Sequence, residues 1–148
     1  EATINENYEL IVVTNLFKNK NYEFYKNKYR NLKFINYSNK NLDNLFLKSD
    51  IILSTSIYEG FPNIVAEGIN YECLIISSKN IGGIHDSIIN NNYGVFYEIN
   101  NTTDLSYKFL NVIKNFNLYK KRIKNSKQNL LKISIDSKRK YLELFKNL

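Results

Sequence analysis

The sequence predicts an α/β fold in which a parallel sheet carries helices on both faces and a helical tail follows at the C-terminus. Within residues 1–100, short apolar runs of strand length alternate with stretches whose apolar residues recur every three or four positions. Such alternation is typical of right-handed βαβ units, which build parallel sheets. After Asn101 only the helical period remains. With 148 residues, 43% hydrophobic and 24% charged, we expect a single domain over residues 1–148, with C-terminal helices over residues 101–148.

Five runs have the composition of buried strands. The segments 10–13 and 51–53, for example, are continuously apolar, as expected for parallel strands that are covered on both faces. The predicted strands span residues 8–14, 33–37, 51–55, 74–77 and 94–97.

The stretches between and after these strands have helical spacing. Tyr22, Tyr25 and Tyr29 form one stripe, and Leu105 and Phe109 belong to another in the C-terminal region. The predicted helices span residues 18–31, 41–48, 63–71, 84–90, 104–116, 118–131 and 136–147.

The composition also argues against several classes of protein. No apolar run approaches the roughly 18 residues that a membrane-spanning helix needs, and residues 1–3 lack the pattern of an export signal, so we expect a cytoplasmic protein. Cys73 and His85 are the only residues of their types, which argues against an internal disulfide and a structural zinc site. The chain begins with Glu1 in place of methionine, which indicates a fragment or a processed form.

The net charge of +7 is concentrated at the C-terminal end, where residues 105–148 carry 12 Lys and Arg against two acidic residues. Two interpretations remain open. The charge is either a solvated helix face in a lysine-rich protein or a contact for an anionic partner, such as the inner face of the plasma membrane. Nucleic acid is not expected as a partner, because the basic residues are nearly all Lys and no binding motif accompanies them.

The loop after the third predicted strand has the chemistry of a ligand site. Gly60 permits a backbone conformation closed to other residues, and Pro62 suits the first turn of a helix. The unpaired amides at the start of that helix favour a phosphate group. Glu59 precedes the helix and Glu67 lies more than one turn inside it, so both carboxylates could accept hydrogen bonds from hydroxyls. A nucleoside-diphosphate sugar offers this mixture of a pyrophosphate and sugar hydroxyls.

Residues 50–70, DIILSTSIYEGFPNIVAEGIN, resemble the donor-site stretch of family 4 (group 1) retaining glycosyltransferases of the GT-B fold, whose donor domain is Rossmann-like. The family signature is one Glu, seven residues and a second Glu, and Glu59 and Glu67 match it. The resemblance covers about residues 8–131, most of the C-terminal domain of such enzymes. Further matches are the glycine pair Gly82-Gly83, Asp86 and Gly94. A simple turn between a strand and a helix also explains the glycine pair. Asp86 is also explained as an acid in the first turn of a helix, where it is favourable to the helix dipole.

The resemblance implies roles around the donor sugar. Glu59 would be the catalytic residue and would hold hydroxyls of the donor hexose. Backbone amides of Gly60 and Phe61 would approach the same sugar. In these enzymes amides and basic side chains stabilise the leaving diphosphate without an obligatory metal, so no metal cofactor is expected.

The resemblance also implies contacts to the nucleotide. Backbone groups would meet the base and the pyrophosphate, and a carboxylate would accept hydrogen bonds from the ribose. These residues are Phe34, Ile35 and Asn36 near the base, Asn63, Ile64 and Val65 at the pyrophosphate, and Glu67 at the ribose.

Several positions depart from the family pattern. Glu72 and Leu74 stand where the family usually has glycine and proline, which leaves the conformation of that turn open. Residues 14–16 replace a glycine-rich turn, and nothing in residues 1–7 matches the Arg/Lys pair that holds the diphosphate. The N-terminal acceptor-binding domain is missing, so the chain alone is expected to be inactive.

The sequence therefore predicts the donor domain of a hexosyltransferase. The full enzyme would transfer a hexose, with retention, from a nucleoside-diphosphate sugar to a glycan or lipid-linked acceptor, as in bacterial cell-envelope polysaccharide biosynthesis. The alternative is a non-catalytic nucleotide-sugar-binding or scaffolding module derived from such an enzyme, which the changed turn at Glu72 and Leu74 slightly favours.

Overall fold

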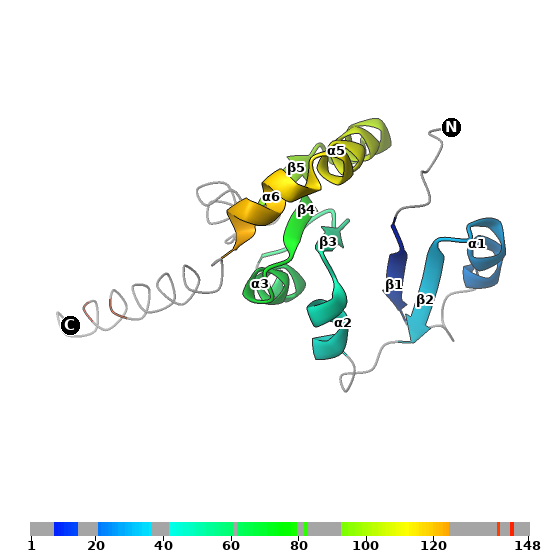
Figure 1. Ribbon diagram of the computed structural model, residues 1–148, viewed down its shortest axis with the longest axis horizontal. Coiled ribbons are helices and arrows are strands. Elements are labelled where there is room, and N and C mark those ends of the chain that lie inside the picture. The colour runs from blue at the N-terminus through cyan, green and yellow to red at the C-terminus, as the bar shows by residue number, and fades with distance from the viewer. Residues whose placement is uncertain are drawn as a thin grey trace. The chain divides into compact units, whose positions relative to one another are not determined.

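The structure is a computed structural model that describes residues 8–14, 21–36, 42–60, 62–79, 82, 93–124, 139 and 143 (Figure 1). The chain divides into two compact units, Glu1–Leu42 and Asp43–Leu148. Both units contain parallel strands and helices, which confirms the predicted α/β class, and the strands form two sheets. The expected single domain over residues 1–148 stays a prediction.

The first unit contains one βαβ unit, formed by β1 (Leu10–Thr14), α1 (Tyr22–Lys28) and β2 (Leu32–Asn36). The two strands are parallel and pair in register over all of their residues. α1 ends three residues before the end of the predicted helix 18–31, because Tyr29 has an extended backbone (φ −125°, ψ 112°) that ends the helix, while residues 18–20 lie outside the described residues.

The second unit is built on a three-stranded parallel sheet in the order β3-β4-β5. α2 precedes the sheet, α3 connects β3 to β4, and α5 and α6 follow β5. In Figure 1, α3 lies on one side of these strands and α5 with α6 on the other. The elements are α2 (Leu42–Lys48), β3 (Ile51–Ser54), α3 (Asn63–Asn70), β4 (Leu74–Ser78), β5 (Gly94–Tyr97), α5 (Thr102–Lys114) and α6 (Phe116–Ile123).

The core of the second unit surrounds β4, the central strand, in which all five residues are buried. Its first three residues, 74–76, form the apolar run that burial on both faces favours, and the buried Ser77 and Ser78 follow them. α3 approaches the sheet closely, since a Cβ atom on Gly68 would lie 2.6 Å from Cγ1 of Ile52. The buried cluster comprises Val65, Ile69, Leu74, Ile75, Ile76, Tyr93, Tyr97, Val112 and Ile123.

The structure shows which conformation the turn between α3 and β4 adopts with Glu72 in place of the family's glycine. This residue adopts φ +59°, the left-handed conformation that glycine favours. The Glu72 amide donates to the Ile69 carbonyl at 3.0 Å, and the Cys73 amide donates to the Gly68 carbonyl at 2.8 Å. These two bonds form a Schellman motif, the usual helix ending with a left-handed residue. The turn therefore keeps the conformation that a glycine would adopt, with a glutamate in it.

Leu74 stands where the family usually has proline, and its amide makes a hydrogen bond that proline could not make. Its amide donates to the Asp50 carbonyl at 2.9 Å and so extends the pairing of β3 with β4. Proline has no amide hydrogen and would forgo this bond. Leucine therefore adds one ladder bond at the start of the central strand.

The C-terminal helices differ from the prediction at their boundaries. α5 begins two residues earlier than predicted, because the Asn101 side chain accepts a hydrogen bond from the Asp104 amide at 2.9 Å and caps the helix at its start. Asn115 separates α5 from α6, so α6 begins at Phe116. The predicted helix 84–90 and the end of the predicted helix 118–131 lie outside the described residues. Within the predicted helix 136–147, only Arg139 and Glu143 are described, and both are helical.

Candidate functional site

The carboxyl ends of β3, β4 and β5 lie along one edge of the sheet, because the three strands are parallel. Ligands of open α/β sheets bind at this edge. The loop over residues 55–62 leaves β3 here and runs directly into α3. It carries Glu59 and Gly60, two of the predicted sugar-binding residues.

Glu59 is half-buried and is held by a neighbouring hydroxyl. The Ser56 Oγ donates a hydrogen bond to the Glu59 Oε1 at 2.7 Å. The Ser56 carbonyl in turn accepts a hydrogen bond from the Ser78 Oγ at 2.7 Å. Ser78 is the last residue of β4 and is 1% exposed, so the carboxylate is connected to the buried strand by two consecutive hydrogen bonds.

Gly82 packs against the same loop. It adopts φ +56°, and a Cβ atom on it would lie 2.3 Å from the Gly60 carbonyl oxygen and 2.5 Å from the Glu59 carbonyl oxygen. The conformation favours glycine, and the contact leaves no room for a Cβ atom. The matched glycine therefore does more than turn the chain, since its missing side chain lets Gly82 itself lie against Glu59 and Gly60. Gly83, His85 and Asp86 lie outside the described residues.

Gly60 differs in one respect from what the sequence predicts. Gly60 does not adopt a positive φ, so its backbone conformation is open to other residues as well. Apart from its neighbours in the chain, no described residue would come within 4 Å of a Cβ atom placed there. The absent side chain leaves space above the loop, which is compatible with the predicted approach of a sugar. Phe61, predicted beside it, lies outside the described residues.

α3 begins at Asn63, and Pro62 is its N-cap residue (φ −77°, ψ 98°) instead of part of the first turn. The Pro62 carbonyl accepts hydrogen bonds from the Val65 amide at 3.0 Å and the Ala66 amide at 3.1 Å. The Val65 amide thus has a partner within the helix, and its role at a pyrophosphate stays a prediction. The amides of Asn63 and Ile64 precede these bonds, and both residues are exposed.

The electrostatic field at the start of α3 favours an anion. The described first turn contains no acidic residue, so the positive end of the helix dipole is not offset there by a carboxylate. Glu67 is exposed and is the fifth residue of the helix. Its charge is the last of four causes that raise the pKa of Tyr71, the first being the hydrogen bond from Tyr71 to Asp43 at 2.8 Å.

The residues predicted near the base lie in the first unit. β2 ends at Asn36, which is exposed, while Phe34 and Ile35 are half-buried. Asn36 therefore stands at the carboxyl end of its strand, where the fold class places ligands.

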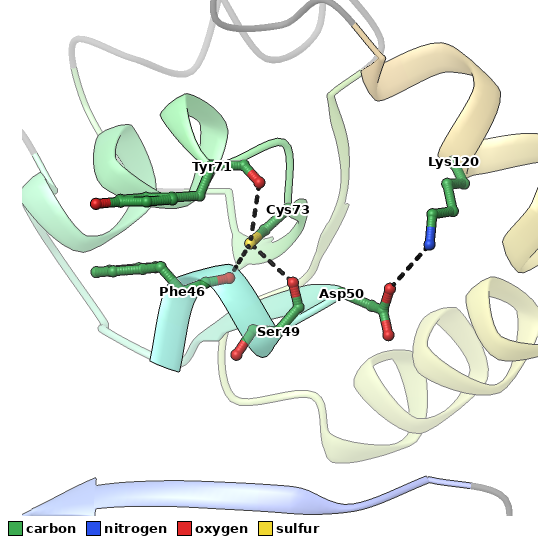
Figure 2. Close-up of polar contacts among 6 residues, drawn as sticks. All are labelled: Phe46, Ser49, Asp50, Tyr71, Cys73 and Lys120. Carbon is green, nitrogen blue, oxygen red and sulfur yellow. Dashed lines mark hydrogen bonds and ion pairs between the residues drawn. The ribbon is translucent and has the colours of Figure 1, made fainter. Parts of the chain in front are cut away.

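Cys73 is a buried free cysteine. Figure 2 shows its thiol facing carbonyl oxygens at the end of α2, 3.1 Å from that of Ser49 and 3.6 Å from that of Phe46. Burial, and then the charge of Asp50, raises the pKa of this thiol to about 11. Asp50 pairs with Lys120 of α6 at 3.3 Å. These contacts connect α2 and α6 to the residues just before β3 and β4.

Metal binding remains a separate question. Within the described ranges, no three His, Cys, Asp or Glu side chains gather closely enough to hold a metal ion. Metal independence stays a prediction.

The described part of the chain contains no helix with the length and apolar character to cross a bilayer.

Comparison with known proteins decides the family. The family model described as glycosyl transferases group 1 matches residues 2–129. The chain belongs to this family. That membership confirms the resemblance seen around Glu59 and Glu67. No curated protein matches the chain.

Solved structures similar to this group 1 chain show its fold. Three of them are WaaG, a glycosyltransferase involved in lipopolysaccharide biosynthesis (17% identity, TM-score 0.66), sucrose-phosphate synthase from Thermosynechococcus elongatus (15%, 0.71) and a glycosyltransferase from Rickettsia africae ESF-5 (24%, 0.71). They match 81%, 95% and 95% of this chain. At these identities the likeness shows the fold alone, the Rossmann-like α/β fold of GT-B glycosyltransferases. The chain spans 33%, 39% and 40% of their respective lengths.

The sequence analysis did not identify two of the residues that form contacts at this edge of the sheet. Ser56 and Ser78 are 22 positions apart, and no spacing rule connects them. The only available signal was their position, just after β3 and at the end of β4, where side chains converge on one edge.

Proposed function

We propose that this chain forms the donor-binding part of a retaining hexosyltransferase. It would bind a nucleoside-diphosphate sugar at the loop after β3 and the start of α3, and the whole enzyme would transfer the hexose to a glycan or lipid-linked acceptor. The observation that best supports this proposal is the Glu59 carboxylate, held half-buried in the loop that leads into the start of α3.

The diphosphate would lie at the first turn of α3. The amides of Asn63 and Ile64 and the helix dipole provide donors and a positive field at that end. During transfer the bond from the sugar to the phosphate is replaced by a bond to an acceptor hydroxyl, so negative charge grows on the leaving diphosphate. Fixed amide donors stabilise such developing charge without reorganising.

The two carboxylates would bind hydroxyl groups of the donor. Glu59 would hold the hexose, beside the open face of Gly60, and Glu67 would hold the ribose. A hydrogen bond to a charged group contributes about 1.5–3 kcal/mol, enough to change affinity by about 10- to 150-fold. The base would contact the carboxyl end of β2, around Ile35 and Asn36.

The proposed partners of the whole enzyme are the donor, the acceptor, an N-terminal acceptor-binding domain and an anionic membrane surface at the cytoplasmic face. Exposed Lys121, Arg122 and Lys124 support the membrane contact, whereas Lys120 already pairs with Asp50. Flotation of the chain with anionic but not neutral vesicles would support this contact, and equal recovery with both would contradict it.

The alternative of a non-catalytic module loses its main support. It rests on the changed turn at Glu72 and Leu74, yet that turn keeps the left-handed conformation, both bonds of its Schellman motif and a hydrogen bond from the Leu74 amide to Asp50.

Calorimetric titration of the chain with uridine, guanosine and adenosine diphosphates tests the proposal. We expect one of them to bind, and Glu67→Ala to weaken its binding at least tenfold by removing a carboxylate from the ribose. Glu72→Ala is the matched control, because it removes a glutamate from the opposite end of α3. Absence of binding by all three nucleotides, or equal losses in both variants, would contradict the proposal.

A further inference from the structure

Two hydrogen bonds, which use the side chain and the backbone carbonyl of Ser56, link the Glu59 carboxylate to the buried central strand. The Ser78 Oγ donates to the Ser56 carbonyl, and the Ser56 Oγ donates to the Glu59 Oε1, both at 2.7 Å. Each hydroxyl hydrogen is therefore committed to a defined acceptor. We refer to Ser78, Ser56 and Glu59 as the serine relay.

The inner end of the serine relay is rigid. Ser78 belongs to β4, whose residues are all buried and which pairs with β3 on one side and β5 on the other. The loop has a second fixed contact, because Gly82 packs against the Glu59 and Gly60 carbonyls. The backbone around Glu59 is thus held at two places, and the Ser56 hydroxyl fixes the side chain.

The hydrogen bond from Ser56 leaves the Glu59 carboxylate able to accept further hydrogen bonds. A carboxylate has two oxygens with about four acceptor sites, and the bond from Ser56 uses one site on Oε1. The remaining acceptor sites suit sugar hydroxyls, which are donors of the right kind. A glutamate free to rotate would lose conformational entropy on binding, whereas one already held by Ser56 loses less.

We propose that Ser56, supported by Ser78, is a positioning residue that presets Glu59 for the sugar part of the donor. This inference rests on the proposed function, because it assumes that Glu59 binds the sugar. Ser56 acts through Glu59 and makes no contact with the nucleotide. It therefore sets the affinity for the sugar without setting the affinity for the diphosphate.

The test compares each nucleoside diphosphate with its sugar conjugate. Dissociation constants of the chain for uridine, guanosine and adenosine diphosphates are measured beside those for UDP-glucose, GDP-mannose and ADP-glucose. With the pair that binds, we expect Ser56→Ala to weaken the sugar conjugate about tenfold, or about 1.4 kcal/mol, and the free diphosphate less than twofold. Ser56→Thr keeps the hydroxyl and should restore most of the affinity.

Two further variants control for folding and for the chemical change. Ser106→Ala makes the same change at an exposed position of α5 and should leave both constants unchanged. Ser78→Ala removes only the support of the Ser56 carbonyl, and we expect about a threefold weakening of the sugar conjugate. It also tests the serine relay if Ser56→Ala does not fold, as judged by circular dichroism.

The outcomes separate this inference from the proposed function. If Glu59→Ala weakens the sugar conjugate selectively while Ser56→Ala and Ser78→Ala do not, the positioning role is wrong and the donor site stands. If Ser56→Ala weakens the conjugate and the diphosphate equally, Ser56 has a general structural role and the inference is also wrong. If the unmodified chain binds no member of either set, the proposed function fails, and this inference with it.

Discussion

Glu72→Gly should stabilise the protein, because Glu72 is a left-handed residue in a turn that suits glycine. Its φ of +59° costs an L-residue about 1–2 kcal/mol. Glycine removes that cost but gains about 0.5–1 kcal/mol of conformational entropy in the unfolded chain. The two bonds of the Schellman motif use backbone atoms only, so the substitution preserves them. The expected net gain in the free energy of unfolding is about 0.5–1 kcal/mol.

Urea unfolding followed by circular dichroism measures this gain, which corresponds to a rise in Tm of about 2–4 °C. Glu72→Ala is the control, since it removes the carboxylate but keeps the Cβ atom that causes the strain. The difference between the Gly and Ala variants therefore isolates the backbone term, and we expect the Gly variant to be more stable by about 1 kcal/mol. Equal stability of the two variants would refute the conformational argument.

Two more predictions concern the site loop and the buried thiol. Gly82→Ala should destabilise the chain by about 2 kcal/mol or more, because its Cβ atom would lie 2.3 Å from the Gly60 carbonyl oxygen. The control Gly60→Ala should change the free energy of unfolding by less than about 0.5 kcal/mol. Equal effects of the two variants in urea unfolding would contradict the packing of Gly82 against the loop. The pKa of Cys73 is raised from 9.0 to about 11, so the folded chain keeps a proton that the unfolded chain loses between these values. Stability should therefore fall as the pH rises from 9 to 11, by up to about 1.4 kcal/mol per unit, and this slope should be smaller in Cys73→Ala. An unchanged slope in that variant would count against the buried, protonated thiol.

The sequence predicts the elements best where the pattern has one physical cause. Residues 74–76, which begin β4, are apolar because both faces of the strand are covered, and that cause is local to the strand. Boundaries are less certain, since they depend on single interactions. α5 begins early because Asn101 caps it, and the spacing of apolar residues does not report a cap.

The candidate site is harder to predict, because it depends on contacts between residues distant in sequence. The family pattern pointed to Glu59, but the hydroxyl that supports its loop belongs to Ser78, on another strand. Glycine at position 60 suggested a special backbone conformation, whereas it is Gly82 that adopts one. Only the folded arrangement shows which glycine has its side-chain position occupied.

The central claim is that the loop after β3 and the start of α3 bind a nucleoside-diphosphate sugar. Backbone amide NMR of the uniformly ¹⁵N-labelled chain, titrated with UDP-glucose, GDP-mannose and ADP-glucose, tests it most directly. We predict that one donor shifts the amide resonances of Glu59, Gly60, Asn63 and Ile64 most strongly. Shifts confined to other parts of the chain, such as α5 and α6, would contradict the account.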